Sequence, residues 1–245
     1  MINPARPSLL VSDLFDAGVA SAELREPPDA GLLYPAEAAL CARFAPKRLA
    51  DFTAGRLCAR RVLDDLGVRD FPLEIERDRS PRWPPGVVGS ITHTQGFCCA
   101  VAARSGATRG VGVDAELVGR LTPELEPIVF TERERRFVDT LTEAARQQAA
   151  TIIFSAKEAF YKCQYPLTRR WLDFTDVQLE LSTRDMQRGT FAVRAANEAV
   201  NANGPTALLG RFCVSGNLVV TGIACDQDTL AELQAIRARD ANVSR

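Results

Sequence analysis

The stretch FCCAVAARSGATRGVGVDAE, residues 97–116, contains two apolar runs separated by a short segment with serine and glycine. Apolar runs of this length, bounded by turn residues, are typical of buried strands. The second run ends in two acids, Asp114 and Glu116. Side chains at i and i+2 lie on the same face of a strand. The stretch therefore predicts two strands, the second of which carries a pair of carboxylates on one face.

Helical and strand patterns occur in blocks on both sides of this stretch. Upstream, residues 35–44 and 47–67 have the apolar spacing of two helices, and Gly67 ends the second. Downstream, residues 131–141 and 142–165 are also expected to be helical, with Pro166 as the stop. The other expected elements are irregular chain at 1–34, a loop at 77–86, strands at 87–93, 176–181, 190–195, 207–214 and 218–225, a hairpin turn at 215–217, and a helix at 228–239.

This order, helices then strands and then the same again, predicts an α+β fold. We expect two similar α+β halves, residues 1–110 and 111–245, although no sequence repeat establishes a duplication. A chain of 245 residues with 46% hydrophobic residues is long enough to form cores in both halves.

Composition excludes several classes of protein and site. A net charge of −1 gives no overall attraction to nucleic acid or to an anionic membrane. The apolar runs are shorter than the ~20 residues that span a bilayer, and no secretory signal is recognisable. Seven scattered cysteines without a CxxC motif favour free thiols in the cytoplasm. His93 is the single histidine, so a zinc site with two His ligands is excluded.

A third acid, Glu158, lies in the apolar helical pattern FSAKEAFYK, residues 154–162. Three carboxylates from two elements would suit Mg²⁺ or Mn²⁺, which prefer hard oxygen ligands and phosphate partners. Two simpler interpretations remain open at this point. Asp114 and Glu116 fit a strand that runs into solvent equally well, and Glu158 with Lys162 fits an i,i+4 salt bridge worth ~0.3 kcal/mol.

Basic and hydroxyl side chains cluster upstream of the acids. Each one alone fits solvated surface, and His93 alone fits a hydrogen-bonded strand residue. Together with a hard-metal site they indicate a phosphate-bearing ligand. These residues are Arg48, Arg56 and Arg60 in the early helices, Arg77 and Arg79 in the proline-rich loop, and Ser90, Thr92 and His93 at a strand end.

Three segments in this order resemble the motifs of the 4'-phosphopantetheinyl transferases. They are WPPGVVGSITHTQGFCCAVAA (83–103), GVGVDAE (110–116) and FSAKEAFYKCQYPLTRRWLDF (154–174). The chain is most similar, over roughly residues 45–220, to the larger single-chain type associated with surfactin, enterobactin, polyketide and mycolate-type synthases. The resemblance implies two similar α+β halves with coenzyme A between them. It also implies transfer of phosphopantetheine to a serine of an apo carrier protein, with release of adenosine 3',5'-bisphosphate.

By matching positions, the resemblance also implies roles for individual residues. Either Glu158 or a water on the metal would accept the proton of the carrier serine, and the sequence does not choose between them. Glu134, four residues after Phe130, would supply a further catalytic acid, with Glu132 as its competitor. The remaining implied roles are Mg²⁺ binding by Asp114, Glu116 and Glu158, coenzyme A binding by Arg48, Arg56, Arg77, Arg79, Ser90, Thr92 and His93, and pyrophosphate contacts by Lys157 and Lys162, with Lys162 neutralising the leaving charge.

The partners follow from the same resemblance. An acidic carrier surface would meet Arg169 and Arg170 beside an exposed Trp171, although a solvated turn with Trp171 in the core fits the sequence equally well. We expect a monomer, because a duplicated chain supplies both sides of the site. A function of another class, a coenzyme A-binding module without activity, remains as the alternative. The presence of all the acids and of Lys162 argues against it.

Overall fold

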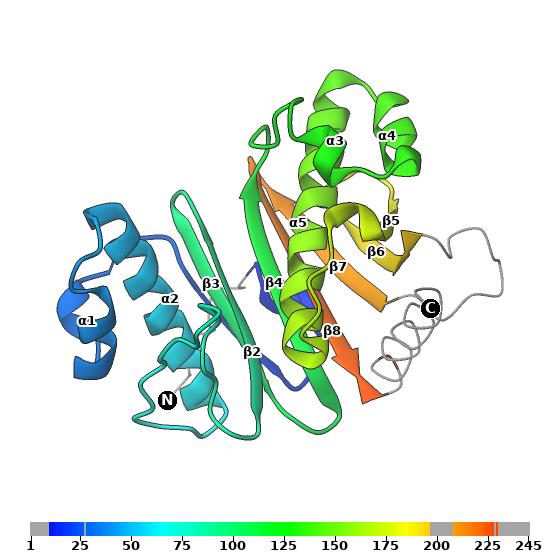
Figure 1. Cartoon of the computed structure of the whole chain (residues 1–245). Helices are drawn as coiled ribbons and strands as arrows, with labels where there is room; N and C mark the ends of the chain where they lie inside the picture. The colour runs from blue at the N-terminus through cyan, green and yellow to red at the C-terminus, as the bar shows by residue number, and fades with distance from the viewer. Residues whose placement is uncertain (1–9, 27, 197–207, 228, 230–245) are drawn as a thin grey trace, which may run out of the picture.

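Two antiparallel sheets form the framework of the protein in a computed structural model, which describes residues 10–26, 28–196, 208–227 and 229 (Figure 1). The first sheet has the strand order β1-β3-β2, and the second has the order β4-β8-β7-β6-β5. The chain passes from the first sheet to the second between Arg104 and Thr108. The expected α+β class is confirmed.

The first sheet is covered by one long helix. Its core consists of apolar side chains from this helix, such as Cys58, Val62 and Leu63, packed against Ala100 and Ala102 of the sheet. The elements of this part are the strands β1 (Val19–Leu24), β2 (Val87–Thr94) and β3 (Phe97–Arg104), the helices α1 (Pro35–Cys41) and α2 (Pro46–Asp65), and the 3-10 helices η1 (Ser12–Leu14) and η2 (Ala30–Leu32).

Strand β1 corrects the expectation that residues 1–34 are irregular. It pairs antiparallel with β3, with Ala22 opposite Ala100. Its sequence, VASAEL, is short and lacks clear alternation, so local pattern gave no strand signal. The strand exists because β3 offers an edge for pairing.

The second sheet is covered by α5, which lies against β4 and β8 (Figure 1). The β7-β8 hairpin turns at Gly216, where φ is 63°, as the SGN segment predicts. The expected helix over 228–239 lies outside the described residues except for position 229. The elements of this part are β4 (Thr108–Leu117), α3 (Glu126–Val129), α4 (Glu132–Asp139), α5 (Glu143–Thr168), the 3-10 helix η3 (Phe174–Asp176), β5 (Val177–Thr183), β6 (Arg188–Ala195), β7 (Leu208–Ser215) and β8 (Leu218–Asp226).

Helix α5 continues through Pro166 to Thr168, three residues beyond the Tyr165 end expected from sequence. Proline removes one backbone donor, which is tolerable in a last turn where little helix remains. The helix ends at Arg169, which adopts a left-handed conformation with φ of 54°.

A shared core joins the two sheets. Cys99 and Val101 of β3 pack with Val111 and Val113 of β4, and the Val113 N–H donates to Ser90 Oγ of β2 over 3.2 Å. Strand β3 is therefore buried on both faces, by α2 on one side and by the second sheet on the other. This packing brings β2 and β4 side by side.

One buried glutamate of the first half, Glu37, makes a set of contacts that recurs in the second half. Glu37, in the first turn of α1, accepts the N–H of Tyr34 over 3.0 Å and the N–H of Leu73 over 2.9 Å. It also pairs with Arg60 of the long helix α2 over 3.2 Å.

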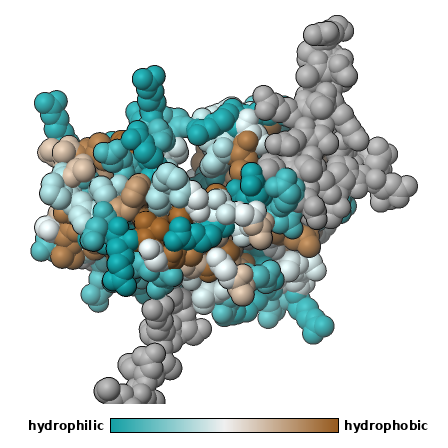
Figure 2. Space-filling model, turned by 90° about the horizontal axis from the view of Figure 1, so that it is seen from below, coloured by the Kyte–Doolittle hydropathy of each residue, from teal (hydrophilic) through white to brown (hydrophobic). Residues whose placement is uncertain are grey.

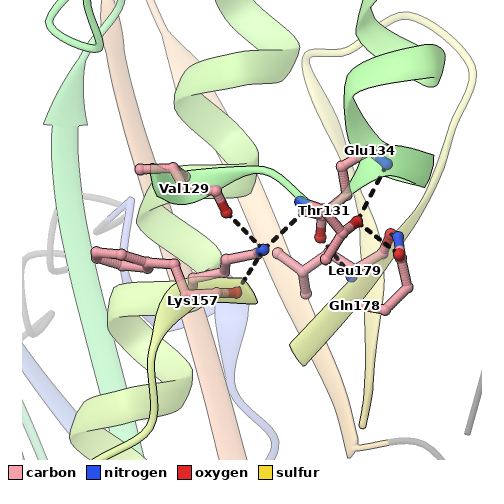
Figure 3. Close-up of polar contacts among 7 residues, drawn as sticks. Val129, Thr131, Glu134, Lys157, Gln178 and Leu179 are labelled. Atoms are coloured by element: carbon pink, nitrogen blue, oxygen red, sulfur yellow. Dashed lines mark hydrogen bonds and ion pairs between the residues drawn. The ribbon is translucent and has the colours of Figure 1, made fainter. Parts of the chain in front are cut away.

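Glu134, in the first turn of α4, repeats this arrangement in the second half (Figure 3). It accepts the N–H of Thr131 over 2.8 Å and the N–H of Leu179 over 2.7 Å, and it pairs with Lys157 of the long helix over 2.7 Å. The glutamate and its cation are 23 residues apart in both halves. The two halves therefore share one capping and ion-pair scheme.

Candidate active site

Asp114 of β4 is the centre of the candidate site. Its side chain is buried, although it is a carboxylate. Oδ1 accepts a hydrogen bond from Thr92 Oγ1 over 3.0 Å and another from Lys162 Nζ over 2.6 Å. Oδ2 is buried and has no hydrogen-bond partner among the described residues. The interpretation of this acid as solvent-exposed surface is therefore wrong.

Glu116 and Glu158 share the electrostatic environment of Asp114. Burial raises the pKa of Glu116 to about 7, and the charge of Asp114 adds to the increase while Lys162 and Arg120 oppose it. Burial also raises the pKa of Glu158, with Lys162 opposing and Asp114 adding. Three carboxylates repelling one another need a cation for full compensation.

Lys162 supplies one cation to this cluster. Burial lowers the pKa of Lys162, but attraction and hydrogen bonding to Asp114 outweigh it, so the net pKa is raised. The ammonium remains charged at neutral pH. The ion pair recorded for Lys162 among the described residues is with Asp114, on another element, and not with Glu158 one turn away. The simple i,i+4 salt bridge is therefore not the arrangement adopted.

The donor set fits a magnesium ion in its chemistry. Mg²⁺ takes carboxylate oxygens together with waters and substrate phosphates, and the unpartnered Oδ2 of Asp114 is a buried oxygen that lacks a donor. Within the described part of the chain, no three His, Cys, Asp or Glu side chains already form a metal-binding group.

Strand β2 contributes two hydroxyls to this site and one ring to the opposite side. Ser90 and Thr92 are buried and directed to β4, where they bond to its backbone and to Asp114. His93 is half-exposed, with Nδ1 3.8 Å from Asp51 Oδ2 of α2. Partial burial lowers the pKa of His93, and Asp51 opposes this. The three residues expected to bind one ligand therefore point in two directions.

Helix α2 provides a buried cation with unused donors. Arg56 is only 5% exposed and lies over the Phe52 ring at 4.2 Å, and its Nε and Nη2 atoms have no partner among the described residues. Burial lowers the pKa of Arg56 to about 10, with Glu37 opposing, so the group remains cationic at neutral pH. Arg48, about two turns closer to the start of α2 than Arg56, is exposed and lies 4.1 Å from the Phe44 ring centroid. Unpaired buried guanidinium donors favour an anionic ligand.

A cavity of about 580 Å³ lies between the proline-rich loop, strands β2 and β4, and α5; Lys162 belongs to its lining, whereas the three acids do not. Its lining includes Arg79, Trp83, Ser90, Tyr161 and Lys162. Figure 2 views the molecule from below and shows hydrophobic side chains gathered near the middle of this face between hydrophilic ones. Arg77 is exposed on the same loop but does not belong to the lining.

Aromatic side chains frame one edge of this cavity. Trp171 is 77% exposed and meets Tyr161 edge-on at 5.2 Å, and Tyr161 stacks on Tyr165 at 5.4 Å. Arg169 lies 5.8 Å from the Tyr165 ring and pairs with Asp78 of the proline-rich loop over 2.9 Å. Trp171 is therefore a surface residue, and its interpretation as core is wrong.

Lys157 does not belong to the ligand site, which corrects its expected contact with pyrophosphate. It is 1% exposed, and Nζ donates to Val129 O over 2.8 Å, Glu134 Oε2 over 2.7 Å and Phe174 O over 2.7 Å (Figure 3). An ammonium has three protons, and all three are used. Burial lowers the pKa of Lys157, and Glu134 opposes this.

Glu134 is likewise not placed as a catalytic acid. Both of its oxygens accept hydrogen bonds inside the protein, and the residue is 1% exposed. Its competitor Glu132 is exposed and pairs with Arg135 and Arg136. The T-x-x-E spacing of Thr131 and Glu134 is the signature of a capping box and was the signal for this structural role.

The cysteines and the helices bear on the expected free thiols and on the expected absence of a membrane span. All seven cysteines are buried free thiols. No helix in the described part of the chain has the length and apolarity needed to cross a membrane.

Comparison with known proteins gives matches over both halves. The family model described as 4'-phosphopantetheinyl transferase N-terminal domain matches residues 36–103, and that of the 4'-phosphopantetheinyl transferase superfamily matches residues 110–209. The chain is 40% identical to 4'-phosphopantetheinyl transferase Svp of Streptomyces mobaraensis over 79% of this chain and 78% of that protein. It is 38% identical to PptT of Mycobacterium tuberculosis over 88% and 96% of the two chains. Enterobactin synthase component D of Salmonella typhi matches at 37% identity over 47% of this chain and 48% of that protein.

Proposed function

Because the chain belongs to the 4'-phosphopantetheinyl transferase superfamily, and is thus a transferase that modifies carrier proteins, we propose that coenzyme A is the donor and that the reaction depends on Mg²⁺. The acceptor is a serine hydroxyl of an apo carrier protein, and the by-product is adenosine 3',5'-bisphosphate. Mn²⁺ would serve in place of Mg²⁺, since it accepts the same oxygen ligands.

One observation carries this proposal. Asp114 is a buried carboxylate with one oxygen bonded to Thr92 and Lys162 and the other without any donor, and two further acids repel it. A divalent cation held by Asp114, Glu116 and Glu158 would satisfy all three. When bound, it would neutralise charge on the pyrophosphate oxygens.

The side chains of this chain have distinct parts in the transfer. Arg56 offers unpaired buried donors to a phosphate, and we assign Arg48, Arg77, Arg79 and His93 to the same ligand. Lys162 binds Asp114, and we assign to it the neutralisation of charge on the leaving bisphosphate. Glu158, whose pKa is raised by burial, is the group to which we assign the proton of the carrier serine. Charge neutralisation and in-line positioning are the main requirements of phosphoryl transfer.

We further propose that the ligand lies between residues 1–110 and 111–245, since Thr92 comes from one part and Asp114 from the other. Free thiols support a reducing compartment, the cytoplasm. The name of the enterobactin relatives supports carriers of siderophore synthases, and polyketide, fatty-acid and peptide synthases provide other candidates.

The test is to mix the purified protein with coenzyme A, Mg²⁺ and a panel of apo carriers and to weigh the carriers by mass spectrometry. We expect one or more carriers to gain the mass of phosphopantetheine, EDTA to stop the reaction, and added Mg²⁺ to restore it. Asp114→Asn and Glu158→Gln should lower transfer at least about 100-fold, because each removes a proposed ligand charge. Glu143→Gln, an exposed change at the start of α5, is the control and should leave activity unchanged.

Two results would contradict the proposal. Binding of coenzyme A without mass gain on any carrier would favour a binding module without activity. Full transfer by Asp114→Asn, or in the presence of EDTA, would reject the metal assignment.

A further inference from the structure

The Glu134–Lys157 cluster, defined by these two side chains with the Val129 and Phe174 carbonyls, joins four segments at one buried point (Figure 3). Lys157 belongs to α5 and directly precedes Glu158. Val129 ends α3, Glu134 begins α4, and Phe174 begins η3. Glu134 also holds β5 through the N–H of Leu179. A buried ion pair with every donor used fixes geometry, and its desolvation makes it a costly way to gain stability alone.

These bonds tie down two chain segments, beside other contacts such as Glu126 with Arg146 and Gln164 with the Arg170 carbonyl. Residues 118–131 lead from the acids of β4 to α4 and are held through Val129 and Glu134. Residues 169–176 follow α5 and are held through Phe174. These segments carry side chains exposed by 46% for Leu125, 61% for Ile128 and 77% for Trp171. The same segments also carry three arginines and four acids, so the exposed apolar side chains, and not a net positive charge, are what they offer to a carrier: Arg120, Arg169, Arg170, Glu124, Glu126, Asp173 and Asp176.

The acids themselves are held by different contacts. Gly112 of β4 lies so close to Ala159 of α5 that an added Cβ would be 1.9 Å from the Ala159 oxygen. Lys162 binds Asp114 from the same helix. These contacts fix α5 on β4 without any contribution from Lys157. Loss of Lys157 should therefore affect the two flanking segments and leave the metal and coenzyme A site in place.

We infer that Lys157 and Glu134 are positioning residues, which hold segments 118–131 and 169–176 in the arrangement that receives the carrier protein. This inference rests on the proposed function, because it names the substrate whose binding the cluster controls. It assigns no direct contact with either substrate to these two residues.

The experiment compares Lys157→Met with the double variant Lys157→Met/Glu134→Gln. The single variant leaves Glu134 as an unpaired buried carboxylate, so it should lose stability. The double variant removes that charge and should regain melting temperature, but neither variant restores the bonds to Val129 and Phe174. We expect KM for the carrier to rise about tenfold in both variants, while the dissociation constant of coenzyme A with Mg²⁺ is unchanged. The carrier used is the one with the largest mass gain in the wild-type assay.

Glu37→Gln provides the matched control, since Glu37 has the equivalent position in the first half. It should lower the melting temperature without raising KM for the carrier. A normal carrier KM in the double variant would show that the cluster serves stability alone and would overturn the inference. Weaker coenzyme A binding would also overturn it.

Hydrogen exchange on the wild-type enzyme gives a second measurement that does not depend on the variants folding. Bound apo carrier should protect amides of residues 118–131 and 169–176, and absence of protection in both would contradict the inference. Failure of the proposed function is distinguishable, because the wild-type protein would then modify no carrier.

Discussion

The two oxygens of Asp114 have different surroundings, and this difference defines the role of its neighbours. Thr92 and Lys162 both bind Oδ1, which leaves Oδ2 for another partner. Thr92 is neutral and buried, so its hydroxyl orients the carboxylate without compensating its charge. Thr92 thus belongs to the first half and orients an acid of the second.

Replacement of Thr92 by valine tests this orienting role. A hydrogen bond to a charged group is worth ~1.5–3 kcal/mol, so kcat/KM should fall at least about tenfold. The Mg²⁺ concentration that gives half-maximal rate should rise, since the carboxylate is less well oriented. Steady-state kinetics at varied Mg²⁺ measure both effects. Thr190→Val, an exposed threonine of β6, is the control, and an unchanged Mg²⁺ dependence in Thr92→Val would contradict the role.

The two lysines of α5 show that the residue type alone does not decide whether a side chain belongs to the site. Lys157 and Lys162 are five residues apart in the same helix, and both were expected beside the pyrophosphate. Five residues correspond to 500° of helix rotation, so they point to different sides. Lys162 faces β4 and the acids, whereas Lys157 faces α3, α4 and η3.

At the scale of elements, the close packing of β4 and α5 brings the acids together. An added Cβ at Gly112 would lie 1.9 Å from the Ala159 oxygen, and one at Gly110 would lie 2.9 Å from the Cys163 oxygen. The glycines of GVGVDAE therefore let a helix approach the strand. This approach places Glu158 and Lys162 of the helix near Asp114 of the strand.

Gly112→Ala tests this requirement. The methyl group would force α5 away from β4, at a cost of ~1–3 kcal/mol or more in the free energy of unfolding. Transfer should fall by more than the loss of folded protein explains, because the acids separate. Denaturant unfolding and the carrier assay measure the two effects. Gly31→Ala, near only the side chain of Asp29, is the control, and full activity per folded molecule in Gly112→Ala would contradict the argument.

Periodicity predicted the long elements well, since α2, α5 and the strands β2, β3 and β4 lie where expected. It failed at β1, whose strand conformation depends on pairing with β3. It also ended α5 too early, because a proline in a final turn does not break a helix.

At the scale of the whole molecule, two parts of the chain share one scheme of buried contacts without a recognisable sequence repeat. Glu37 with Arg60 and Glu134 with Lys157 have the same spacing of 23 residues and the same capping role. Only the glutamates are identical in type, and the cations differ. A shared glutamate and a shared positive charge at one spacing are too few for a comparison of the chain with itself to recognise as a repeat.

Both sides of the site come from one chain, so we expect a monomer. Thr92 belongs to the first half, and Asp114 and Lys162 belong to the second. Light scattering coupled to gel filtration should give a mass near 26.7 kDa. A stable dimer that loses activity on dilution would contradict this expectation.

The sequence by itself determined the α+β class, the long elements and the family, because periodicity and motif spacing are local properties of the chain, and the acid set of Asp114, Glu116 and Glu158 stays its prediction. Tertiary structure alone decided which charges are used for binding and which for holding the fold. Lys157 and Glu134 resemble site residues in sequence, but packing buries them together away from Asp114. A side chain's partners depend on the elements that surround it, and these meet only in the folded molecule.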